Sequence, residues 1–150
     1  ASGLIGENPI NTPKNLFPLI VKTALNQNTN LSIFGNDWPT KDGTCIRDFV
    51  HITDLANAHV ATLNLLISTK PQIISLNIGT GKGHSVLEVV ETFMRVNDVS
   101  VPYVFQERRK GDNYYAVANN ELALSLLNWQ PVKTLEDICR DTWNFANITS

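Results

Sequence analysis

One short segment of the sequence, Gln72–Ile78 (QIISLNI), is rich in β-branched residues and apolar almost throughout. Strands covered on both faces of a parallel sheet show this continuous apolarity, whereas half-exposed strands alternate. Such a strand needs neighbours, yet only Leu31–Phe34 and Pro102–Gln106 also have the pattern of strands. Because a sheet usually has about five or six strands, these three segments predict that Gln72–Ile78 lies in a sheet completed elsewhere.

Helix signals alternate with the strand signals. Ser85 and Glu88 form a capping-box pattern, Thr134-Leu135-Glu136-Asp137 predicts another helix start, and Asp54 precedes an apolar helical stripe and is predicted to cap it. The predicted helices cover residues 13–27, 54–68, 85–97, 119 or 120 to 127, and 134–146, the first entered through Thr12-Pro13. Helices interleaved with strands indicate an α/β fold, and 150 residues with 43% hydrophobic content fit one core.

Charge and hydropathy exclude several classes of function. Twelve Lys and Arg against 14 Asp and Glu give a net charge of -2, which offers no basic field for nucleic acid. The apolar runs end well before the ~20 residues of a membrane span, and the chain does not begin with a secretion signal. We therefore expect a cytoplasmic protein that binds neither nucleic acid nor membrane.

A glycine-rich turn, Gly79–Gly83 (GTGKG), follows the apolar segment and precedes a predicted helix, which is where a phosphate-binding loop would lie. Its spacing fits neither the dinucleotide-binding pattern G-x-G-x-x-G nor the P-loop ending G-K-[ST]. A tight turn is the favoured interpretation, with phosphate binding as the alternative.

Asp48, His51 and Asp54 recur every third residue, which would suit a metal ion on a helical face. They span a strand-like stretch and a helix start, and no fourth ligand is evident. Cys45 and Cys139 are 94 positions apart without a second cysteine near either. No metal site is therefore predicted.

Arginines provide a more informative pattern. Arg47 lies in an otherwise apolar stretch, and Arg108-Arg109-Lys110 precedes a Gly-Asp turn. Two guanidinium groups can each meet a pair of pyrophosphate oxygens, although a solvated charge cluster gives the same spacing. The residues alone leave both interpretations open.

Four stretches carry a resemblance to a known family: NPINTPKNLFPLI, LSIFGNDWPTKDGTCIRDFVHITDLANAH, LNIGTGKGHSVLEVV and ERRKGDNYYAVANN. In order and separation they resemble the C-terminal part of UDP-galactose 4-epimerases, also called UDP-glucose 4-epimerases, of the extended short-chain dehydrogenase/reductase superfamily. The resemblance covers nearly the whole chain.

The resemblance implies a two-lobed, NAD(P)-binding Rossmann-type enzyme. Its N-terminal lobe binds NAD, and its C-terminal lobe holds a UDP-sugar that is interconverted between UDP-galactose and UDP-glucose at C4 through a 4-keto intermediate. Residues 1–150 then form the UDP-sugar-binding portion, with about 51–90 docking on the NAD lobe and contributing a strand and a helix there. The full-length enzyme is expected to be a homodimer.

The same resemblance assigns the nucleotide contacts. Ser32 and Phe34 resemble the residues that frame uracil, Arg47 and Arg109 those that bind the pyrophosphate, and Asp112 the one at the ribose. These are the substrate-binding residues expected around the UDP group.

Three further residues are assigned in this way. Asn15 and Leu16 resemble residues that contact the nucleotide-sugar phosphates, and Ala116 falls beside the sugar where the family has a tyrosine or a smaller residue. The small Ala116 side chain suggests room for a 2-N-acetyl group, so UDP-N-acetylglucosamine is an expected substrate.

The family's catalytic and cofactor motifs are not found in this sequence. It has no G-x-x-G-x-x-G, and Tyr103, Tyr114 and Tyr115 are followed four places later by residues other than lysine, so Y-x-x-x-K is absent. No catalytic or NAD-binding residue is predicted in the chain, which alone should be inactive. The alternatives are another nucleotide-sugar epimerase or dehydratase, or a UDP-sugar-binding module without catalysis.

Overall fold

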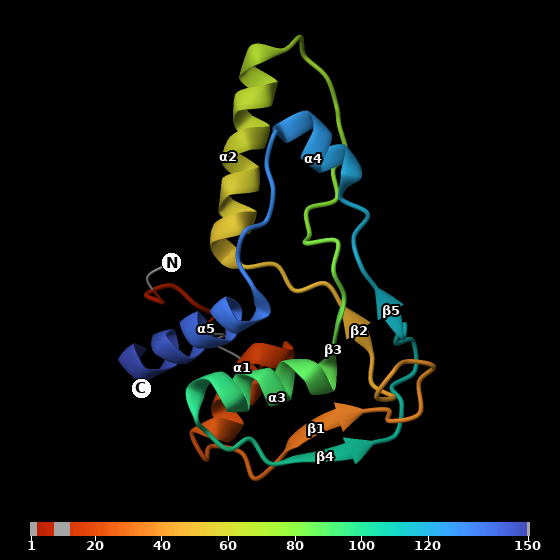
Figure 1. Ribbon diagram of the computed structural model, residues 1–150, viewed down its shortest axis with the longest axis vertical. Helices are drawn as coiled ribbons and strands as arrows, with labels where there is room; N and C mark the ends of the chain where they lie inside the picture. The colour runs from red at the N-terminus through yellow and green to blue at the C-terminus, as the bar shows by residue number, and fades with distance from the viewer. Residues whose placement is uncertain (1–2, 8–12, 150) are drawn as a thin grey trace.

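The computed structural model describes residues 3–7 and 13–149, and their fold is α/β as predicted (Figure 1). The helices are α1 (Leu16–Ala24), α2 (Ile52–Ser68), α3 (Val86–Asn97), α4 (Glu121–Leu127) and α5 (Leu135–Thr149). The strands are β1 (Leu31–Phe34), β2 (Ile46–Arg47), β3 (His84–Ser85), β4 (Tyr103–Gln106) and β5 (Tyr115–Ala116). Among the described residues, no helix is both long and apolar enough to cross a bilayer.

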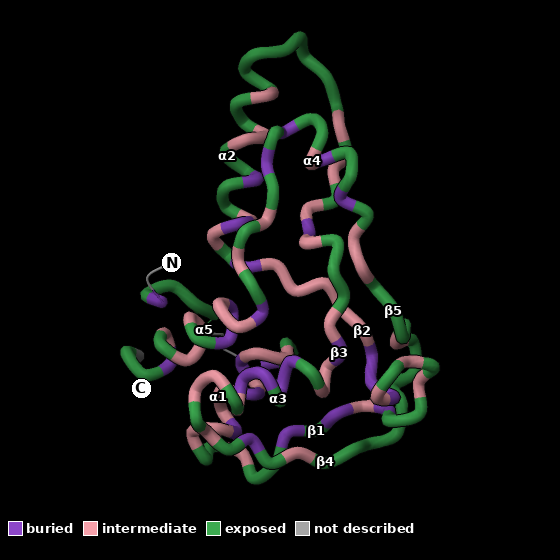
Figure 2. Tube along the Cα trace, in the orientation of Figure 1, coloured by how far each residue is buried: buried purple, intermediate pink, exposed green. Residues whose placement is uncertain are grey.

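The lower part of the molecule holds the main core. β1 and β4 pair in parallel, with Leu31 opposite Tyr103 and Phe34 opposite Gln106, and α1, α3 and α5 pack nearby (Figure 1). The buried side chains that fill this core are Ile20, Leu31, Ile33, Val89, Val90, Phe93, Val101, Leu135 and Cys139. Figure 2 shows that the buried residues concentrate around α1, α3 and β1. Leu31 and Ile33 anchor β1 in this core.

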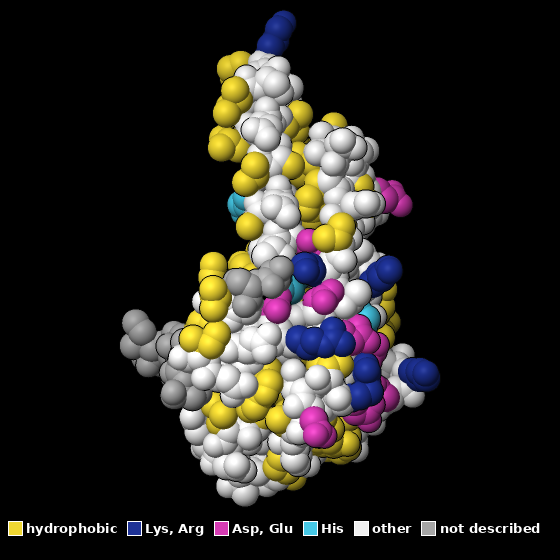
Figure 3. Space-filling view, turned by 60° about the vertical axis from the view of Figure 1, so that its left-hand side comes forward, with side chains coloured by type: hydrophobic (Ala, Val, Ile, Leu, Met, Phe, Trp, Pro, Cys, Tyr) yellow, Lys and Arg dark blue, Asp and Glu magenta, His cyan; other side chains and the backbone are white. Residues whose placement is uncertain are grey.

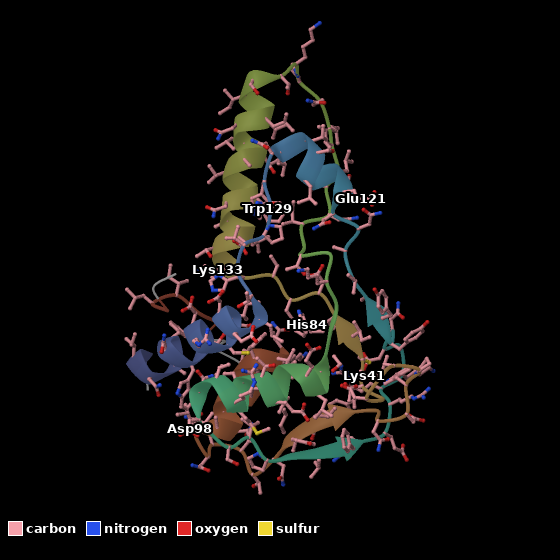
Figure 4. All side chains as sticks on the ribbon, viewed as in Figure 1. Lys41, His84, Asp98, Glu121, Trp129 and Lys133 are labelled. Carbon is pink, nitrogen blue, oxygen red and sulfur yellow. The ribbon has the colours of Figure 1, made fainter. Side chains whose placement is uncertain are left out.

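A smaller core lies in the upper part, where α4 packs against α2 (Figure 1). It contains Ala58, Ala123, Leu127 and Trp129, and Figure 4 shows Trp129 beside α2. Hydrophobic side chains also lie on the surface of this upper part (Figure 3). Val60, Leu63 and Ile67 on α2 are each more than half exposed.

The prediction of a strand at Gln72–Ile78 is wrong for the described residues. The segment has no regular secondary structure, and Ile73 is 100% exposed. Its exposure alternates instead, because Leu76 and Ile78 pack against the upper core while Ser75 and Asn77 face outward. A strand requires a hydrogen-bonded neighbour, and none of the described strands pairs with this segment.

Local helix signals have mixed outcomes. Ser85 and Glu88 form the predicted capping box of α3, and Thr134 accepts a hydrogen bond from the Asp137 amide at the start of α5. The prediction that Asp54 caps α2 is wrong, because the helix begins at Ile52 and His51 is the cap. His51 takes this role because its Nδ1 accepts from the Thr53 amide at 3.1 Å.

The bounds of two predicted helices also differ. α1 is shorter than the predicted 13–27 and begins after Asn15; Thr12, half of its predicted entry, lies outside the described residues. α5 continues to Thr149, three residues beyond the predicted end. Pro18 is accommodated because it lies in the first turn of α1, where its missing N–H costs little.

Candidate functional site

Three of the predicted substrate residues meet where β1 and β4 end. The two strands are parallel, so their carboxyl ends lie at the same edge. Just beyond that edge the Arg109 guanidinium carbon lies 4.6 Å from the centre of the Phe34 ring. Arg109 also donates from Nε to Asp112 Oδ2 at 2.9 Å and from Nη2 to Oδ1 at 3.3 Å. Phe34, Arg109 and Asp112 thus form one cluster, called the Arg109 cluster below.

Ser32 lies on the same face of β1 as Phe34. Leu31 and Ile33 point into the core, whereas Ser32 is exposed and Phe34 is partly exposed. Residues two apart in a strand share a face, so a flat ligand on Phe34 would also meet Ser32. The strand therefore presents a small polar group and an aromatic ring together.

A second pair of predicted residues meets in the other sheet. β2 lies between β3 and β5, and Arg47 is opposite Ala116 in the parallel β2–β5 pair. The Arg47 Nη1 donates to the Ile46 carbonyl at 2.8 Å. Arg47 and Ala116 thus lie side by side through backbone pairing.

Tyr114 connects these two groups. Its carbonyl accepts from the Ile46 amide beside Arg47, and its ring stacks on Trp38, on the loop that follows Phe34. No contact among the described residues joins the guanidinium groups of Arg47 and Arg109 directly. Their convergence on one diphosphate stays a prediction.

Asn15 and Leu16 stand at the start of α1. Asn15 is the N-cap residue of α1, and its Nδ2 donates to Glu7 Oε1 at 2.8 Å. Leu16 packs at the edge of the main core. No contact in the described ranges joins either residue to Arg47 or Arg109, so their predicted phosphate contacts stay predictions.

The Gly79–Gly83 turn is held by the carboxylate of Asp48, one of the three metal candidates. Asp48 Oδ1 accepts from the amide and hydroxyl of Thr80, and Oδ2 accepts from the amides of Gly81 and Ala118. A side chain at Gly79 would lie 2.5 Å from Asp48 Oδ2. The turn amides that would bind a phosphate are therefore occupied, which favours the tight-turn interpretation. The partner residues are more than 30 positions away, so no local pattern signals this contact.

The other two metal candidates also have separate partners. His51 Nε2 donates to Asp141 Oδ2 at 3.0 Å, because its Nδ1 is the acceptor for Thr53. Asp54 is buried and accepts from the amides of Val132 and Lys133. Asp48, His51 and Asp54 thus stabilise three different junctions of the chain.

The loop between β1 and β2 is fixed by Asp42. Its carboxylate accepts from the amide and hydroxyl of Thr44 at 2.9 and 2.8 Å and from the Ser85 hydroxyl at the start of α3. Burial acts to raise the pKa of Asp42, but the hydrogen bonds from Ser85 and Thr44 together outweigh it and lower that pKa. Asp42 is therefore anchored as a carboxylate.

A cavity of about 320 Å³ lies elsewhere, between α1, α5 and residues 5–7. Phe17, His51 and Ile138 are among its lining residues, and none of the predicted substrate residues is. Its lining is mainly apolar, and its polar His51–Asp141 pair is already hydrogen-bonded. The cavity therefore does not mark the predicted substrate site.

Comparison with known proteins identifies the family of the chain. Residues 2–79 match the family described as NAD dependent epimerase/dehydratase. The UDP-glucose 4-epimerase of Dictyostelium discoideum is 43% identical over 147 residues, which cover 98% of this chain and 43% of that protein. The chain therefore belongs to the NAD dependent epimerase/dehydratase family.

Two of the solved structures with a similar fold are UDP-glucose 4-epimerases. A UDP-glucose 4-epimerase from Stenotrophomonas maltophila, crystallised with NAD and formylated UDP-arabinopyranose, has a TM-score of 0.95 and 44% identity over 99% of this chain and 44% of that one. The enzyme from Bifidobacterium longum, in complex with NAD+ and UDP, has a TM-score of 0.91 and 35% identity over 98% of this chain and 43% of that one. This chain is thus similar to UDP-glucose 4-epimerases and spans about 43% of the length of the curated relative from Dictyostelium. The predicted family resemblance is confirmed.

Proposed function

We propose that this chain is the UDP-sugar-binding portion of a UDP-glucose 4-epimerase, an NAD-dependent isomerase that interconverts UDP-galactose and UDP-glucose at C4. The observation that carries the proposal is the Arg109 cluster, in which a cation, an aromatic face and a carboxylate meet at one strand edge. Similarity to UDP-glucose 4-epimerases over nearly the whole chain supports it.

The Arg109 cluster suits a uridine diphosphate. Phe34 supplies a flat apolar surface for uracil beside the Ser32 hydroxyl, and Asp112 supplies acceptors for ribose hydroxyls. Asp112 already holds Nε and Nη2 of Arg109, so the other guanidinium donors remain for phosphate oxygens. Arg47 adds a second guanidinium, with Asn15 and Leu16 contacting the phosphates from the start of α1.

Anchoring by the nucleotide leaves the sugar free to present either face. The UDP group does not react, so its contacts can position the hexose without binding it tightly. Ala116, opposite Arg47 in the sheet, contributes only a methyl group beside the sugar. The chain's task is therefore to bind UDP firmly and enclose the hexose loosely.

The glycine-rich turn Gly79–Gly83 does not offer the amides of Thr80 and Gly81 to an NAD phosphate. These two amides, the candidates for a phosphate-binding turn, donate to Asp48. NAD supplies hydride acceptance and return when bound, and its site belongs to the remainder of the full-length protein, as does the catalytic base.

The exposed apolar side of α2 is consistent with docking on that remainder. Val60, Leu63 and Ile67 recur at helical spacing on the surface, and Ile73 is fully exposed. We infer that residues 51–90 pack on the NAD lobe, where Gln72–Ile78 gains the neighbours that a strand needs. The full-length protein is proposed to act as a cytoplasmic homodimer.

The test is a substrate comparison with a full-length protein that contains this sequence. Incubation with UDP-galactose should yield UDP-glucose, whereas dTDP- and GDP-hexoses should react much more slowly. Faster conversion of a dTDP- or GDP-sugar would replace the proposal with another epimerase or dehydratase. Tight UDP binding without any conversion would instead indicate a binding module.

A further inference from the structure

We propose that Arg108 is a positioning residue that, through Asp37 and Trp38, determines where Arg109 stands at the substrate site; this inference rests on the proposed function. Arg108, its partners Asp37 and Trp38, and Tyr114, which stacks on Trp38, are called the Arg108 clamp below. None of the four is among the predicted substrate residues.

The segment that carries Arg109 and Asp112 needs support from outside. After β4 ends at Gln106, residues 107–113 form neither helix nor strand, and residues 107–111 are exposed. The amide of Asp112 donates to the Arg109 carbonyl, which closes a turn within the segment but does not attach it to the body. Support must come from its side chains.

Arg108 supplies that support through two kinds of contact. Its Nε donates to Asp37 Oδ1 at 2.6 Å, and its Nη2 donates to the Asp37 carbonyl. Its guanidinium carbon lies 4.0 Å from the centre of the Trp38 ring. A planar fork that donates along its edge and stacks on its face is held in both position and orientation, which a lysine could not reproduce.

Gly35 allows this arrangement at the end of β1. Its φ is +83°, and a Cβ there would lie 2.4 Å from Trp38 Nε1 and 3.0 Å from Arg108 Cγ. The Gly35 amide continues the β1–β4 ladder by donating to the Gln106 carbonyl at 2.8 Å. Backbone pairing and side-chain stacking therefore join the two strand ends at one point. Figure 4 labels Lys41, on the loop that carries Trp38.

The Arg108 clamp also reaches the second group of substrate residues. The Trp38 ring stacks on Tyr114, with ring centres 6.3 Å apart and an interplanar angle of 23°. Tyr114 directly precedes β5, which pairs with β2 and so aligns Ala116 with Arg47. One tryptophan thus contacts the segments that carry Arg109 and Ala116.

The charge of Asp37 and its contact with Arg108 predict opposite effects on UDP binding when Asp37 is removed, which makes the Arg108 clamp testable. UDP is an anion, so removing a nearby carboxylate strengthens its binding if only through-space electrostatics matter. Removing Asp37 also releases Arg108, which weakens binding if Arg108 positions Arg109. Asp37 and Arg108 side chains are 69% and 40% exposed, so losing their ion pair should leave global folding nearly unchanged.

The experiment compares Asp37→Ala with Glu107→Ala in the full-length protein. Glu107 is exposed in the same segment and makes no ion pair in the part of the chain that the structure describes, so its loss changes charge alone. We expect Asp37→Ala to raise KM for UDP-galactose by about five- to thirty-fold with kcat within about twofold of wild type. Glu107→Ala should leave KM unchanged or lower it. A KM for Asp37→Ala at or below the wild-type value overturns the proposal.

Two further variants separate geometry from charge. Arg108→Lys keeps the charge but loses the fork, so it should raise KM as Asp37→Ala does; a wild-type KM for Arg108→Lys also overturns the proposal. Trp38→Phe keeps an aromatic face and should restore most of the affinity that Trp38→Ala loses. A wild-type protein that binds no UDP refutes the proposed function itself. If wild type binds UDP and Asp37→Ala has the wild-type KM, only the Arg108 clamp is refuted.

Discussion

Arg47 and Ala116 lie opposite each other in the parallel pair of β2 and β5. The backbone register therefore aligns the residue predicted to bind the diphosphate with the residue predicted to lie beside the sugar. The side chain at position 116 is only a methyl group, and Ala116 is exposed. The space that a larger residue would occupy is therefore open beside Arg47.

This space predicts activity on UDP-N-acetylglucosamine. Ala116→Tyr in the full-length protein should lower turnover of that substrate by roughly tenfold or more, because a bulky side chain then meets the N-acetyl group. Turnover of UDP-glucose should change less, which provides the internal control. Steady-state rates with both substrates measure the effect, and equal rates before and after the substitution would contradict it.

Arg47→Ala should act on substrate binding rather than on the chemical step. A guanidinium that holds the unreactive diphosphate contributes equally to the ground and transition states, so its loss raises KM and leaves kcat nearly unchanged. A contact with a charged group predicts a change of about tenfold or more. Arg95→Ala is the matched control, since Arg95 lies on the surface of α3 and pairs with Glu136 of α5. A fall in kcat with an unchanged KM would contradict the anchoring role.

Asp48→Asn should destabilise the folded protein. The Asp48 carboxylate accepts from Thr80, Gly81 and Ala118, and an amide would place a donor against some of these donors. We expect a loss of about 1–3 kcal/mol in the free energy of unfolding, measured by urea denaturation. The exposed Glu91→Gln on α3 serves as control and should stay within about 0.5 kcal/mol of wild type. An unchanged midpoint for Asp48→Asn would show that this carboxylate does not hold the turn.

Asp42 predicts a specific pH dependence of stability. Hydrogen bonds from Ser85 and Thr44 outweigh burial and lower its pKa in the folded state, so the folded state favours the ionised form. The contribution is fully present above the unfolded aspartate pKa of about 3.9 and is lost as the pH falls through the lower folded value.

Urea denaturation of wild type and Asp42→Asn at a series of pH values measures this contribution. Wild type should be the more stable at neutral pH, and the difference should shrink as the pH falls below about 4. A difference that is constant across the acidic range would show that ionised Asp42 is not the group responsible.

Sequence patterns predicted the elements whose signals are local. Strand β1 has the bounds that the sequence pattern predicts, and the Ser85–Glu88 capping box starts α3 as expected. The predicted capping role of Asp54 is wrong because cap preference is a local rule, whereas its carboxylate accepts from the amides of Val132 and Lys133 almost 80 residues away. The apolar pattern of Gln72–Ile78 indicates a preference for strand, but pairing needs a neighbour that the described chain does not provide.

The candidate site was only partly predictable for the same reason. The resemblance selected Phe34, Arg109 and Asp112, and the structure brings them together. Arg108 and Asp37 are 71 positions apart, and nothing local to either residue indicates their contact. The two-residue strands β2 and β5 are too short for periodicity, so the alignment of Arg47 with Ala116 appears only in the fold.

Binding of UDP to the full-length protein, measured by titration calorimetry for wild type, Arg47→Ala, Arg109→Ala and the double variant, tests most directly whether this chain anchors the nucleotide. Uridine serves as the ligand without phosphates. Each single substitution should weaken UDP binding by about tenfold or more and affect uridine much less, and the combined loss should differ from the sum because both groups share one diphosphate. Wild-type affinity for UDP in either single variant would contradict the assignment of the two arginines to one nucleotide.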